Sequence, residues 1–573
     1  MLLKAGAAGL GAVAGGPLLA GCSEPGPDPQ QSMGTKVQPQ VTLGPEVDPL
    51  PPYPQGYVGP RARQVNPFHD GSTTFKIVVP QNADVVGDWN DNEMTTWFQE
   101  RTGVKVKFQG VLLTASDGSP DLTKVNAMIA SGDLPDAFMG IPFTDAQISL
   151  YGSQGLFQPL QDHIQTQAPA MQQVLVDYPD LLPYLKSLDG KIYQFKALSD
   201  CYHCHVSPSR AWVNRKYLDA VGGQVPTTPE ELRELLLLFK DQDPSGTGKM
   251  LPFAAGVDNN VDAFIMNAFL YNPSGTQTGG WMRLNNEKVE FVADKPEWRE
   301  ALRYLRTLNQ DGTLGAEAFT MTGAQLLQAG NQGRIGFARC FYQGSFIDVN
   351  TKAEAPWRDY VAVPPLKGPG GVQYAAWDYS PLTGPPLLIT NKCTQPEVLV
   401  QWADNHLDLV AQLHAYAGEQ GKNWDWGKQG ETGLNGKQAL FRLNAWPAPQ
   451  RQSWYLYQVY YLSKDFRLGQ YSDPKNPDLE KTLFDATAAY EPFAEPREMH
   501  LPRLIFSESA AGQQADTAAS IQVHMRQTIA EFATGKRDIN SDADWQNHLD
   551  TLGKMGLTGY LNLYQEAYDS RPR

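Results

Sequence analysis

The sequence predicts an α/β protein with two lobes, each made of separate stretches of chain, and a helical C-terminal part. Three observations support this prediction. The chain has 573 residues, too many for one ordinary hydrophobic core. Strand and helix patterns alternate along its body, and the C-terminal stretch is helical in pattern. The composition is 41% hydrophobic, with 13 Trp, 24 Tyr and 23 Phe, which excludes a fully disordered chain.

Charge and cysteine content exclude two further classes. The net charge is −15, which disfavours a broad nucleic-acid surface because phosphate binding needs clustered Lys and Arg. Five cysteines in a chain of this length do not make a disulfide scaffold.

The N-terminus predicts export. Lys4 precedes a Gly- and Ala-rich apolar stretch that ends Leu19-Ala-Gly-Cys22. This ending resembles the bacterial lipobox, so residues 1–22 are predicted to be a lipoprotein signal peptide and Cys22 the lipidated residue. The alternative is a plain signal peptide with an unmodified Cys22, and the true start can lie upstream.

Residues 23–72 are Pro-rich, with few large apolar side chains and no helical period, which predicts an extended tether. No later segment has about 18 uninterrupted apolar residues, so no membrane-spanning helix is predicted after it. An anchor, a tether and a folded body together predict a protein held on the outer face of the cell membrane.

The first folded stretch reads strand, helix, strand, helix, strand. The run 74–79 is rich in β-branched residues and ends at Pro80. Asn92 is a typical helix N-cap and Gly103 a typical helix end. The next elements are a strand at 104–108, a helix at 122–129 and a strand at 137–139. This order predicts a parallel sheet with right-handed crossovers.

The later segments repeat the mixture of strands and helices. Thr228 followed by Pro-Glu-Glu is a good helix start. We predict strands at 211–214, 335–338 and 387–390, and helices at 228–239, 297–308, 396–413, 518–534, 545–555 and 560–568.

Several phrases in this order resemble one protein family. The most diagnostic is Met128-Ile-Ala-Ser-Gly-Asp-Leu-Pro-Asp136, and the others lie at 97–104, 188–193, 214–219, 225–232 and 418–424. From residue 73 on, the chain resembles the extracellular solute-binding proteins of ABC importers, family 1, and among them the large oligosaccharide-binding lipoproteins.

The resemblance implies a type II periplasmic-binding fold, with two lobes joined by hinge strands and the ligand between them. We assign residues 73–200 and 331–386 to lobe 1, and residues 201–330 and 387–573 to lobe 2. The implied mechanism is capture, closure of the hinge and delivery to a membrane permease. Clefts between lobes are also where small-molecule sites usually form.

Aromatic residues in Gly-, Asn- or Asp-rich loops are the first ligand candidates, because flat rings pack on the apolar faces of sugars. Trp89 follows the first strand, on the side where ligands bind in α/β sheets. The alternative for each candidate is packing of its own loop. The set is Trp89, Trp281, Trp377, Tyr379 and Trp424, with Trp426 beside the last.

Polar residues near these rings would complete the site. Arg339 follows a buried strand and can instead form a structural ion pair. Asp133 can equally be a turn or cap residue. The polar candidates are Asp88, Asn90, Asp133, Arg339 and Asp378.

A degenerate calcium loop follows the helix at 228–239, where the resembling proteins often carry an EF-hand-like loop. Counted from Asp243, the oxygens of Ser245, Thr247 and the Lys249 carbonyl are in place, with Gly248 sixth. Leu251 and Ala254 stand where later carboxylates belong. We therefore expect a turn that has lost its metal and no required cofactor, with calcium bound at this loop as the alternative.

The segment Cys201-Tyr-His-Cys-His205 has two interpretations. In an extended chain Cys201, His203 and His205 would share one face and form part of a zinc site, but a four-ligand signature is missing. A Cys201–Cys204 disulfide is simpler outside the cell. The remaining pair is Cys340 and Cys393, and the sequence leaves open whether they are bonded across a hinge.

Enzyme signatures are absent from the sequence: it has no Gly-x-Ser-x-Gly, no His-Glu-x-x-His and no phosphate-binding loop. We therefore predict a non-enzymatic, monomeric carbohydrate receptor that works with permease subunits. The alternatives are a receptor for peptides and an exported glycosidase or lyase, since paired carboxylates are not readable from sequence.

Overall fold

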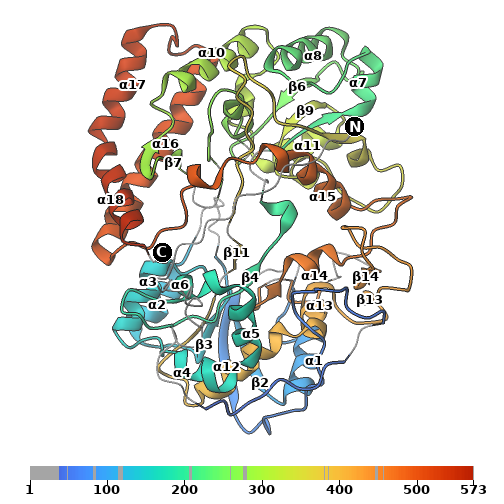
Figure 1. Ribbon diagram of the computed structural model, residues 1–573, viewed down its shortest axis with the longest axis vertical. Coiled ribbons are helices and arrows are strands. Elements are labelled where there is room, and N and C mark those ends of the chain that lie inside the picture. The colour runs from blue at the N-terminus through green and yellow to red at the C-terminus, as the bar shows by residue number, and fades with distance from the viewer. Residues whose placement is uncertain are drawn as a thin grey trace, which may run out of the picture.

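A computed structural model describes residues 38–571, except 48–49, 82–85, 114–120, 206–209, 259, 275, 277–279, 380, 385, 445–449 and 456. Figure 1 shows two lobes stacked along the long axis, with small strands between them. The signal peptide and Cys22 lie outside the described residues.

Lobe 1 (residues 38–199 and 382–468) is built on a four-stranded sheet. Its order is β12 (Leu387–Ile389), β3 (Ala137–Met139), β1 (Thr74–Pro80), β2 (Lys105–Val111). β1 pairs in parallel with β2 and β3, as predicted, while β12 is antiparallel to β3. β3 and β12 are buried along their whole length and β1 along most of it, whereas the edge strand β2 exposes Lys105, Lys107 and Gln109.

The helices of lobe 1 begin and end largely where the sequence predicts. Asn92 accepts the Met94 amide and Gly103 adopts the left-handed conformation that closes α1. The helices are α1 (Glu93–Thr102), α2 (Thr123–Ser131), α3 (Asp145–Ser153), α4 (Gln161–Gln167), α5 (Pro169–Asp177), α6 (Leu182–Leu185), α12 (Pro396–Asp404), α13 (Leu409–Ala417) and α14 (Lys464–Leu468). A small hairpin, β13 (Trp424–Trp426) and β14 (Phe441–Leu443), lies beside α13.

Lobe 2 (residues 211–363 and 479–571) has its own four-stranded sheet. The order is β10 (Tyr360–Val363), β5 (Ala211–Asn214), β9 (Ile335–Arg339), β6 (Leu251–Ala254). β6 and β9 are parallel, so their carboxyl ends meet at one edge of the sheet. A hairpin of β7 (Met282–Asn285) and β8 (Lys288–Phe291) extends the lobe.

The C-terminal helices belong to lobe 2. Trp298 and Leu305 of α10 share one core with Met525 and Phe532 of α16. Figure 1 shows α16, α17 and α18 as a wall along one side of the molecule. The helices are α7 (Arg215–Val221), α8 (Pro229–Gln242), α9 (Asp262–Ile265), α10 (Pro296–Gln310), α11 (Gly323–Asn331), α15 (Leu479–Tyr490), α16 (Glu508–Thr534), α17 (Asp542–Lys554) and α18 (Leu557–Asp569).

The predicted hinge strands are present. A three-stranded sheet of β11 (Leu382–Thr383), β4 (Leu198–Ser199) and β15 (Tyr461–Leu462) lies at the side of lobe 1 that faces lobe 2. Three crossovers connect it to lobe 2: crossover 1 (200–210), crossover 2 (364–381) and crossover 3 (469–478). The two-lobe α/β architecture is thereby confirmed.

The predicted division of the chain is wrong in its second half. We expected residues 331–386 in lobe 1, but β9 and β10 pair with β5 and β6 of lobe 2. We expected residues 387–573 in lobe 2, but β12 pairs with β3 of lobe 1. The error arises because the sequence of a buried apolar strand does not indicate which sheet the strand joins.

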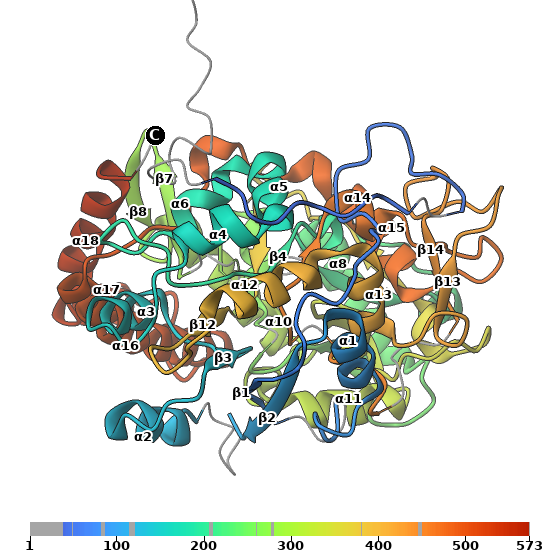
Figure 2. The ribbon, with the colours of Figure 1, turned by 90° about the horizontal axis from the view of Figure 1, so that it is seen from below.

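Part of the predicted tether is folded. Residues from 40 onward lie along lobe 1 as a strap, drawn in blue across α5 and α12 in Figure 2. The amides of Gln40 and Val41 donate to the Thr166 carbonyl, and Tyr57 and Ala62 are buried. The strap (residues 40–69) is therefore part of lobe 1, so folding begins well before residue 73. No helix within the described residues is both long and apolar enough to cross a membrane.

Candidate functional site

A cavity of about 720 Å³ lies in lobe 2, at the carboxyl ends of β6 and β9. Ligand sites of α/β proteins form at this edge of a sheet, and the volume is in the usual range for small-molecule sites. Aromatic rings, amides, hydroxyls and arginines share its wall. Its polar and aromatic lining is Asp258, Asn260, Ser274, Thr276, Trp281, Arg339, Phe341, Gln514, Gln522, Arg526, Tyr560 and Tyr564.

The indole of Trp281, a predicted ligand residue, lines this cavity. Its backbone has φ of 62°, which is uncommon outside glycine and turns the chain sharply before β7. The indole Nε1 donates to the carboxylate of Asp262 at 3.2 Å, and only 5% of the residue is exposed. The side chain is therefore fixed before any ligand arrives.

Arg339, also predicted, ends β9 at the same cavity. Its guanidinium lies 5.1 Å from the ring of Phe341, within the range of a cation–π contact. Burial lowers the pKa of Arg339 to about 10, so the side chain stays charged at neutral pH. The structure thus brings two predicted residues, Trp281 and Arg339, into one site.

One face of α16 supplies cavity residues that the sequence analysis missed. Gln514, Ala518, Gln522 and Arg526 recur every fourth residue and lie on one side of the helix. Small Ala side chains on this face leave room for a ligand beside the polar ones. The signal was a stripe of amides and alanines that continues into the apolar side of the same helix, where Ile521, Met525 and Phe532 are buried.

Two tyrosines of α18 complete this wall. The Gln514 amide donates to the Tyr564 hydroxyl at 2.8 Å, and the hydroxyls of Tyr560 and Tyr564 are 3.3 Å apart. The tyrosines are separated by one helical turn and present a polar edge to the cavity.

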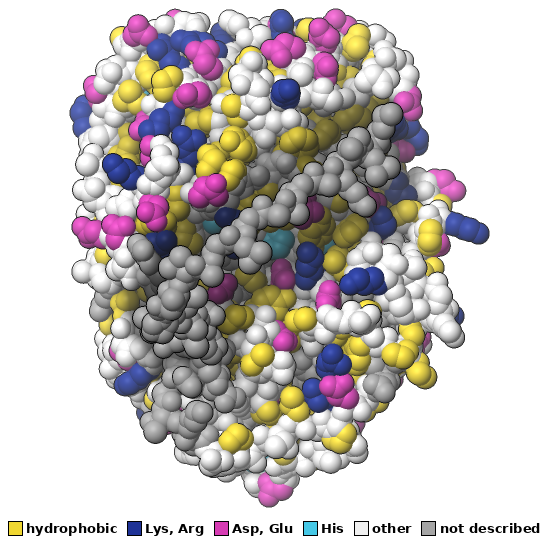
Figure 3. Space-filling model, viewed as in Figure 1, with side chains coloured by type: hydrophobic (Ala, Val, Ile, Leu, Met, Phe, Trp, Pro, Cys, Tyr) yellow, Lys and Arg dark blue, Asp and Glu magenta, His cyan; other side chains and the backbone are white. Residues whose placement is uncertain are grey.

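A second group of predicted residues lies on crossover 2. Trp377 is buried and stacks on His205 of crossover 1, with ring centroids 5.5 Å apart. The amide of Asp378 donates to the His205 carbonyl, and the Tyr379 hydroxyl donates to the Glu495 carbonyl. These residues join two crossovers to one another. Figure 3 shows histidine side chains (cyan) near the middle of this face, between the upper and lower halves of the molecule.

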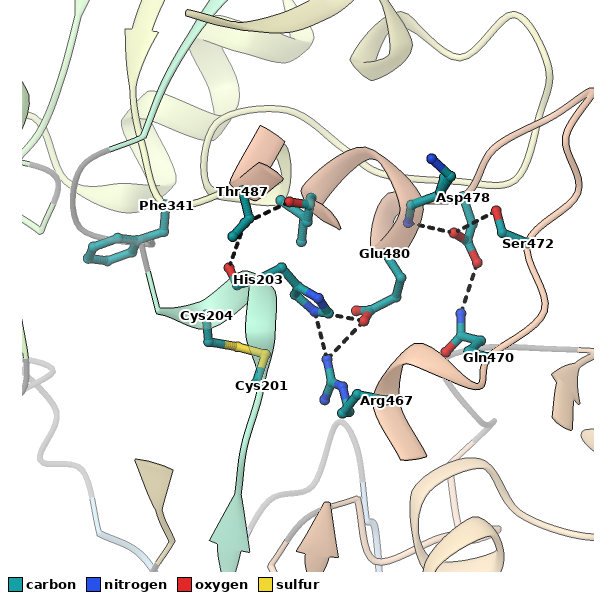
Figure 4. A network of polar contacts seen from close by, with 12 residues as sticks. Cys201, His203, Cys204, Phe341, Arg467, Gln470, Ser472, Asp478, Glu480 and Thr487 are labelled. Carbon is teal, nitrogen blue, oxygen red and sulfur yellow. Dashed lines mark hydrogen bonds and ion pairs between the residues drawn. A yellow bond between two sulfur atoms is a disulfide. The ribbon is translucent and has the colours of Figure 1, made fainter. Parts of the chain in front are cut away.

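The hinge also contains a buried ionic network, which we call the hinge clasp (Figure 4). Glu480 of α15 lies 2.8 Å from both Arg467 of α14 and His203 of crossover 1. Burial opposes ionisation of Glu480, but the charge of Arg467 and then that of His203 outweigh it and hold its pKa well below the usual range. Burial lowers the pKa of His203. The clasp therefore ties lobe 1, lobe 2 and crossover 1 together.

A further ion pair joins the lobes away from the hinge sheet. Arg503, in the segment before α16, donates to Asp145 at the start of α3, and Lys196 lies 3.3 Å from the same carboxylate. Burial opposes ionisation of Asp145, but these two cations hold its pKa below the usual value. The structure thus shows the lobes in contact on two sides.

The other predicted ligand residues take the alternatives considered for them. Trp89 is only 2% exposed and packs in the core of lobe 1 against Phe108 and Trp454. Trp424 is fully buried in lobe 1 and stacks edge-on with Trp426.

The predicted polar residues of lobe 1 are used in local structure. Asn90 bonds in both directions to the backbone of Phe108, and exposed Asp88 accepts the Asn90 amide. Asp133 is exposed in the turn after α2. None of these three residues lines the cavity of lobe 2.

The calcium-loop candidate is a self-bonded turn. Asp243 accepts the Ser245 hydroxyl and, at 2.6 Å, the Gly248 amide, while Thr247 lies 2.8 Å from Ser245. The Lys249 carbonyl, a would-be ligand, accepts the Arg334 guanidinium at 2.8 Å. Positions 251 and 254 offer no carboxylate. The residues present do not make a complete calcium site, since two of the six ligand positions, among them the one that takes a bidentate Glu, carry no oxygen side chain.

The cysteines resolve the second ambiguity of the sequence. Cys201 and Cys204 form a disulfide, as predicted, and neither sulfur is then a thiolate for zinc. Cys340 and Cys393 are free and buried, so the bond considered between them is not formed. They lie in different lobes, Cys340 after β9 and Cys393 after β12.

A second cavity, of about 650 Å³, lies between the strap and the helices of lobe 1. Its arginines and Asp408 form ion pairs, Arg61 and Arg63 with Glu46 and Asp408 with Arg101. The two other carboxylates of its wall, Asp404 and Asp177, accept hydrogen bonds from lobe 1. We interpret this second cavity as space left where the strap packs on the helices of lobe 1.

Comparison with known proteins places the chain in a family. Residues 82–405 match the family model described as bacterial extracellular solute-binding protein. The chain is 24% identical over 518 residues to the fructooligosaccharide ABC transporter substrate-binding protein FusA of Streptococcus pneumoniae, covering 87% of this chain and 90% of that protein.

Solved structures of FusA have the same fold. FusA in complex with kestose superposes with a TM-score of 0.71 at 22% identity, covering 87% of this chain and 99% of that one. A FusA EF-hand mutant in complex with fructo-nystose gives 0.70 at 22% identity, with the same coverage.

Proposed function

The chain belongs to the bacterial extracellular solute-binding proteins, and on this premise we propose that it is the carbohydrate-binding component of an ABC importer. The observation that carries the proposal is the lobe 2 cavity, where aromatic rings alternate with amides, hydroxyls and arginines. Sugars present apolar C–H faces and a dense set of hydroxyls, and such a wall matches both.

The preferred ligand is an oligosaccharide rather than a monosaccharide or a peptide. The cavity of about 720 Å³ is too large for one sugar ring to fill, and its amides and hydroxyls suit many neutral polar groups. The relative that matches along most of this chain is described as a fructooligosaccharide-binding protein. Kestose is therefore the first probe.

Transport would use the hinge. Sugar binds to the wall of lobe 2, lobe 1 closes over it about the sheet of β4, β11 and β15, and the closed form is delivered to the permease. We propose no catalytic step, since the matched relatives are described as binding proteins.

Proteins of this family act outside the cytoplasm. We propose in addition that Cys22 is lipidated and holds a monomer at the outer face of the membrane, as the ending Leu-Ala-Gly-Cys supports. We propose that the turn at Asp243 holds no calcium and that the protein needs no cofactor.

The test is a titration of the exported protein with kestose and a panel of other oligosaccharides and peptides, followed by calorimetry. Stoichiometric binding of a sugar without product formation supports the proposal. Binding of a peptide alone, or release of shorter sugars during incubation, would refute it.

A further inference from the structure

Glu495 is a fully buried carboxylate in the segment that connects α15 to α16. Its exposed fraction is 0%, and no cation of the Lys or Arg type lies within ion-pair distance of it among the described residues. Burying a carboxylate costs free energy unless hydrogen bonds replace those lost to water. The groups that donate to Glu495 therefore indicate its role.

Three donors from three segments meet on this carboxylate. The Tyr271 hydroxyl donates to Oε1 at 2.8 Å, and the backbone amide of Trp377 donates to Oε2 at 2.9 Å. Nδ1 of His500 lies 3.3 Å from Oε1. The Tyr379 hydroxyl donates to the backbone carbonyl of Glu495 itself.

The donors belong to parts of the protein that have different tasks. Tyr271 starts the segment that supplies Ser274, Thr276 and Trp281 to the lobe 2 cavity. Trp377 lies in crossover 2, which runs directly into β11 of the hinge sheet. Glu495 thus forms hydrogen bonds both to the segment that walls the cavity and to the crossover that leads into the hinge sheet.

We propose that Glu495 is a positioning residue of the solute site, coupling the cavity segment at Tyr271 to the hinge crossover at Trp377. The proposal rests on the proposed function, because it assumes that the lobe 2 cavity binds the solute. A ligand that shifts the Tyr271 segment then shifts crossover 2 as well, since both are bonded to the same rigid carboxylate.

The ionised form of Glu495 performs this task, because a carboxylate accepts all three donors at once. Glutamine keeps the shape but directs an N–H₂ group at a donor, so at least one bond is lost. Burial raises the pKa of Glu495, which moves its protonation toward neutral pH. The other charged or titratable groups facing this cluster are Asp378, Tyr379, Arg497, Glu498 and His500.

The first test compares kestose affinity in wild type, Glu495→Gln and Tyr271→Phe by calorimetry at pH 8. Glu495→Gln is expected to weaken binding at least tenfold, and Tyr271→Phe, which loses one neutral hydrogen bond, about two- to tenfold. The matched control is Asp404→Asn, another buried carboxylate that accepts two backbone amides, those of Ala170 and Met171 in lobe 1. The control is expected to stay within twofold of wild type.

An affinity of Glu495→Gln within twofold of wild type overturns the proposal. Equal weakening in the Asp404→Asn control also overturns it, because general destabilisation would then explain both. A pH series adds a second criterion: wild-type affinity should fall in acid, starting above pH 4.5, the ordinary pKa of Glu, and Glu495→Gln should lack this decline. Identical pH profiles overturn the proposal as well.

A ligand-free arm separates this proposal from the proposed function. Hydrogen–deuterium exchange of residues 374–379 is expected to speed up at least tenfold in Glu495→Gln, with no change in Asp404→Asn. If wild type binds no sugar, the proposed function fails and this arm still decides whether Glu495 holds the crossover. Unchanged exchange there refutes the positioning role.

Discussion

Replacement of Glu480 by Gln tests the hinge clasp. The change removes a charge that faces Arg467 and His203, each 2.8 Å away, and leaves Arg467 without its carboxylate. Breaking a buried ion pair costs roughly 3–5 kcal/mol. Because the Glu480 side chain is still 18% exposed, we take the lower end, about 3 kcal/mol.

This loss converts into a melting shift. For a lobe of roughly 150–250 residues, each kcal/mol of lost stability lowers Tm by roughly 2–4 °C. Glu480→Gln should therefore lower Tm by about 6–12 °C. The assay is calorimetric melting at pH 7. Glu431→Gln is the control, because Glu431 is 17% exposed and pairs with Arg442 at 2.9 Å, but both residues belong to the hairpin of β13 and β14 in lobe 1. The control should cost less, since it joins no distant segments.

The pH dependence has a definite sign. The pKa of Glu480 lies below its ordinary value of 4.5 in the folded protein, so its contribution is present above pH 4.5 and is lost as the pH falls toward the depressed value. The difference in Tm between wild type and Glu480→Gln should therefore shrink in acid. A Tm shift no larger than that of the control, or a shift that persists unchanged in acid, would refute the reasoning.

Three further predictions follow from particular residues. Gln522→Ala, at an exposed position of the cavity wall, should weaken sugar binding about two- to tenfold by calorimetry with Tm unchanged. Burial raises the pKa of Asp404 to about 7, so the wild-type protein should lose stability as the pH rises from about 4 through 7. In melts of Asp404→Asn this loss should be smaller, by up to about 4 kcal/mol. Cys340 and Cys393 should react with a thiol reagent only after denaturation, whereas rapid labelling of the native protein would contradict their burial.

The position of the site explains how binding can be coupled to closure. The cavity is lined only by lobe 2 residues within the described chain, so a sugar can bind before lobe 1 moves. The hinge clasp and the pair of Asp145 with Arg503 join the lobes without touching that cavity. Variants of these pairs are therefore expected to change closure more than the initial contact with sugar.

Local structure was largely readable from the sequence because local rules govern it. The cap at Asn92, the glycine at 103 and the Thr228 helix start lie where their hydrogen bonds require them. The turn of the Cys201–Cys204 segment needs only neighbouring residues, so its disulfide was predictable too.

Only some residues of the candidate site could be predicted from the sequence. Trp281 and Arg339 could be found because they follow Gly-rich or strand-end positions, which mark the ligand edge of a sheet. Trp89 has the same local setting but is buried, since Phe108 and Trp454 happen to cover it. Composition around a tryptophan does not tell whether another segment will pack over it.

By itself, then, the sequence determined the two-lobe α/β class, most helix and strand positions and the resemblance to solute-binding proteins, because capping, periodicity and short motifs act over a few residues. Only the tertiary structure decided which sheet β9 and β12 join and that α16 and α18 wall the cavity. It also decided that the strap packs on lobe 1 and that Glu495 connects three distant segments. These features depend on contacts between residues far apart in the chain, and hydrophobic burial, which drives them, does not specify a partner.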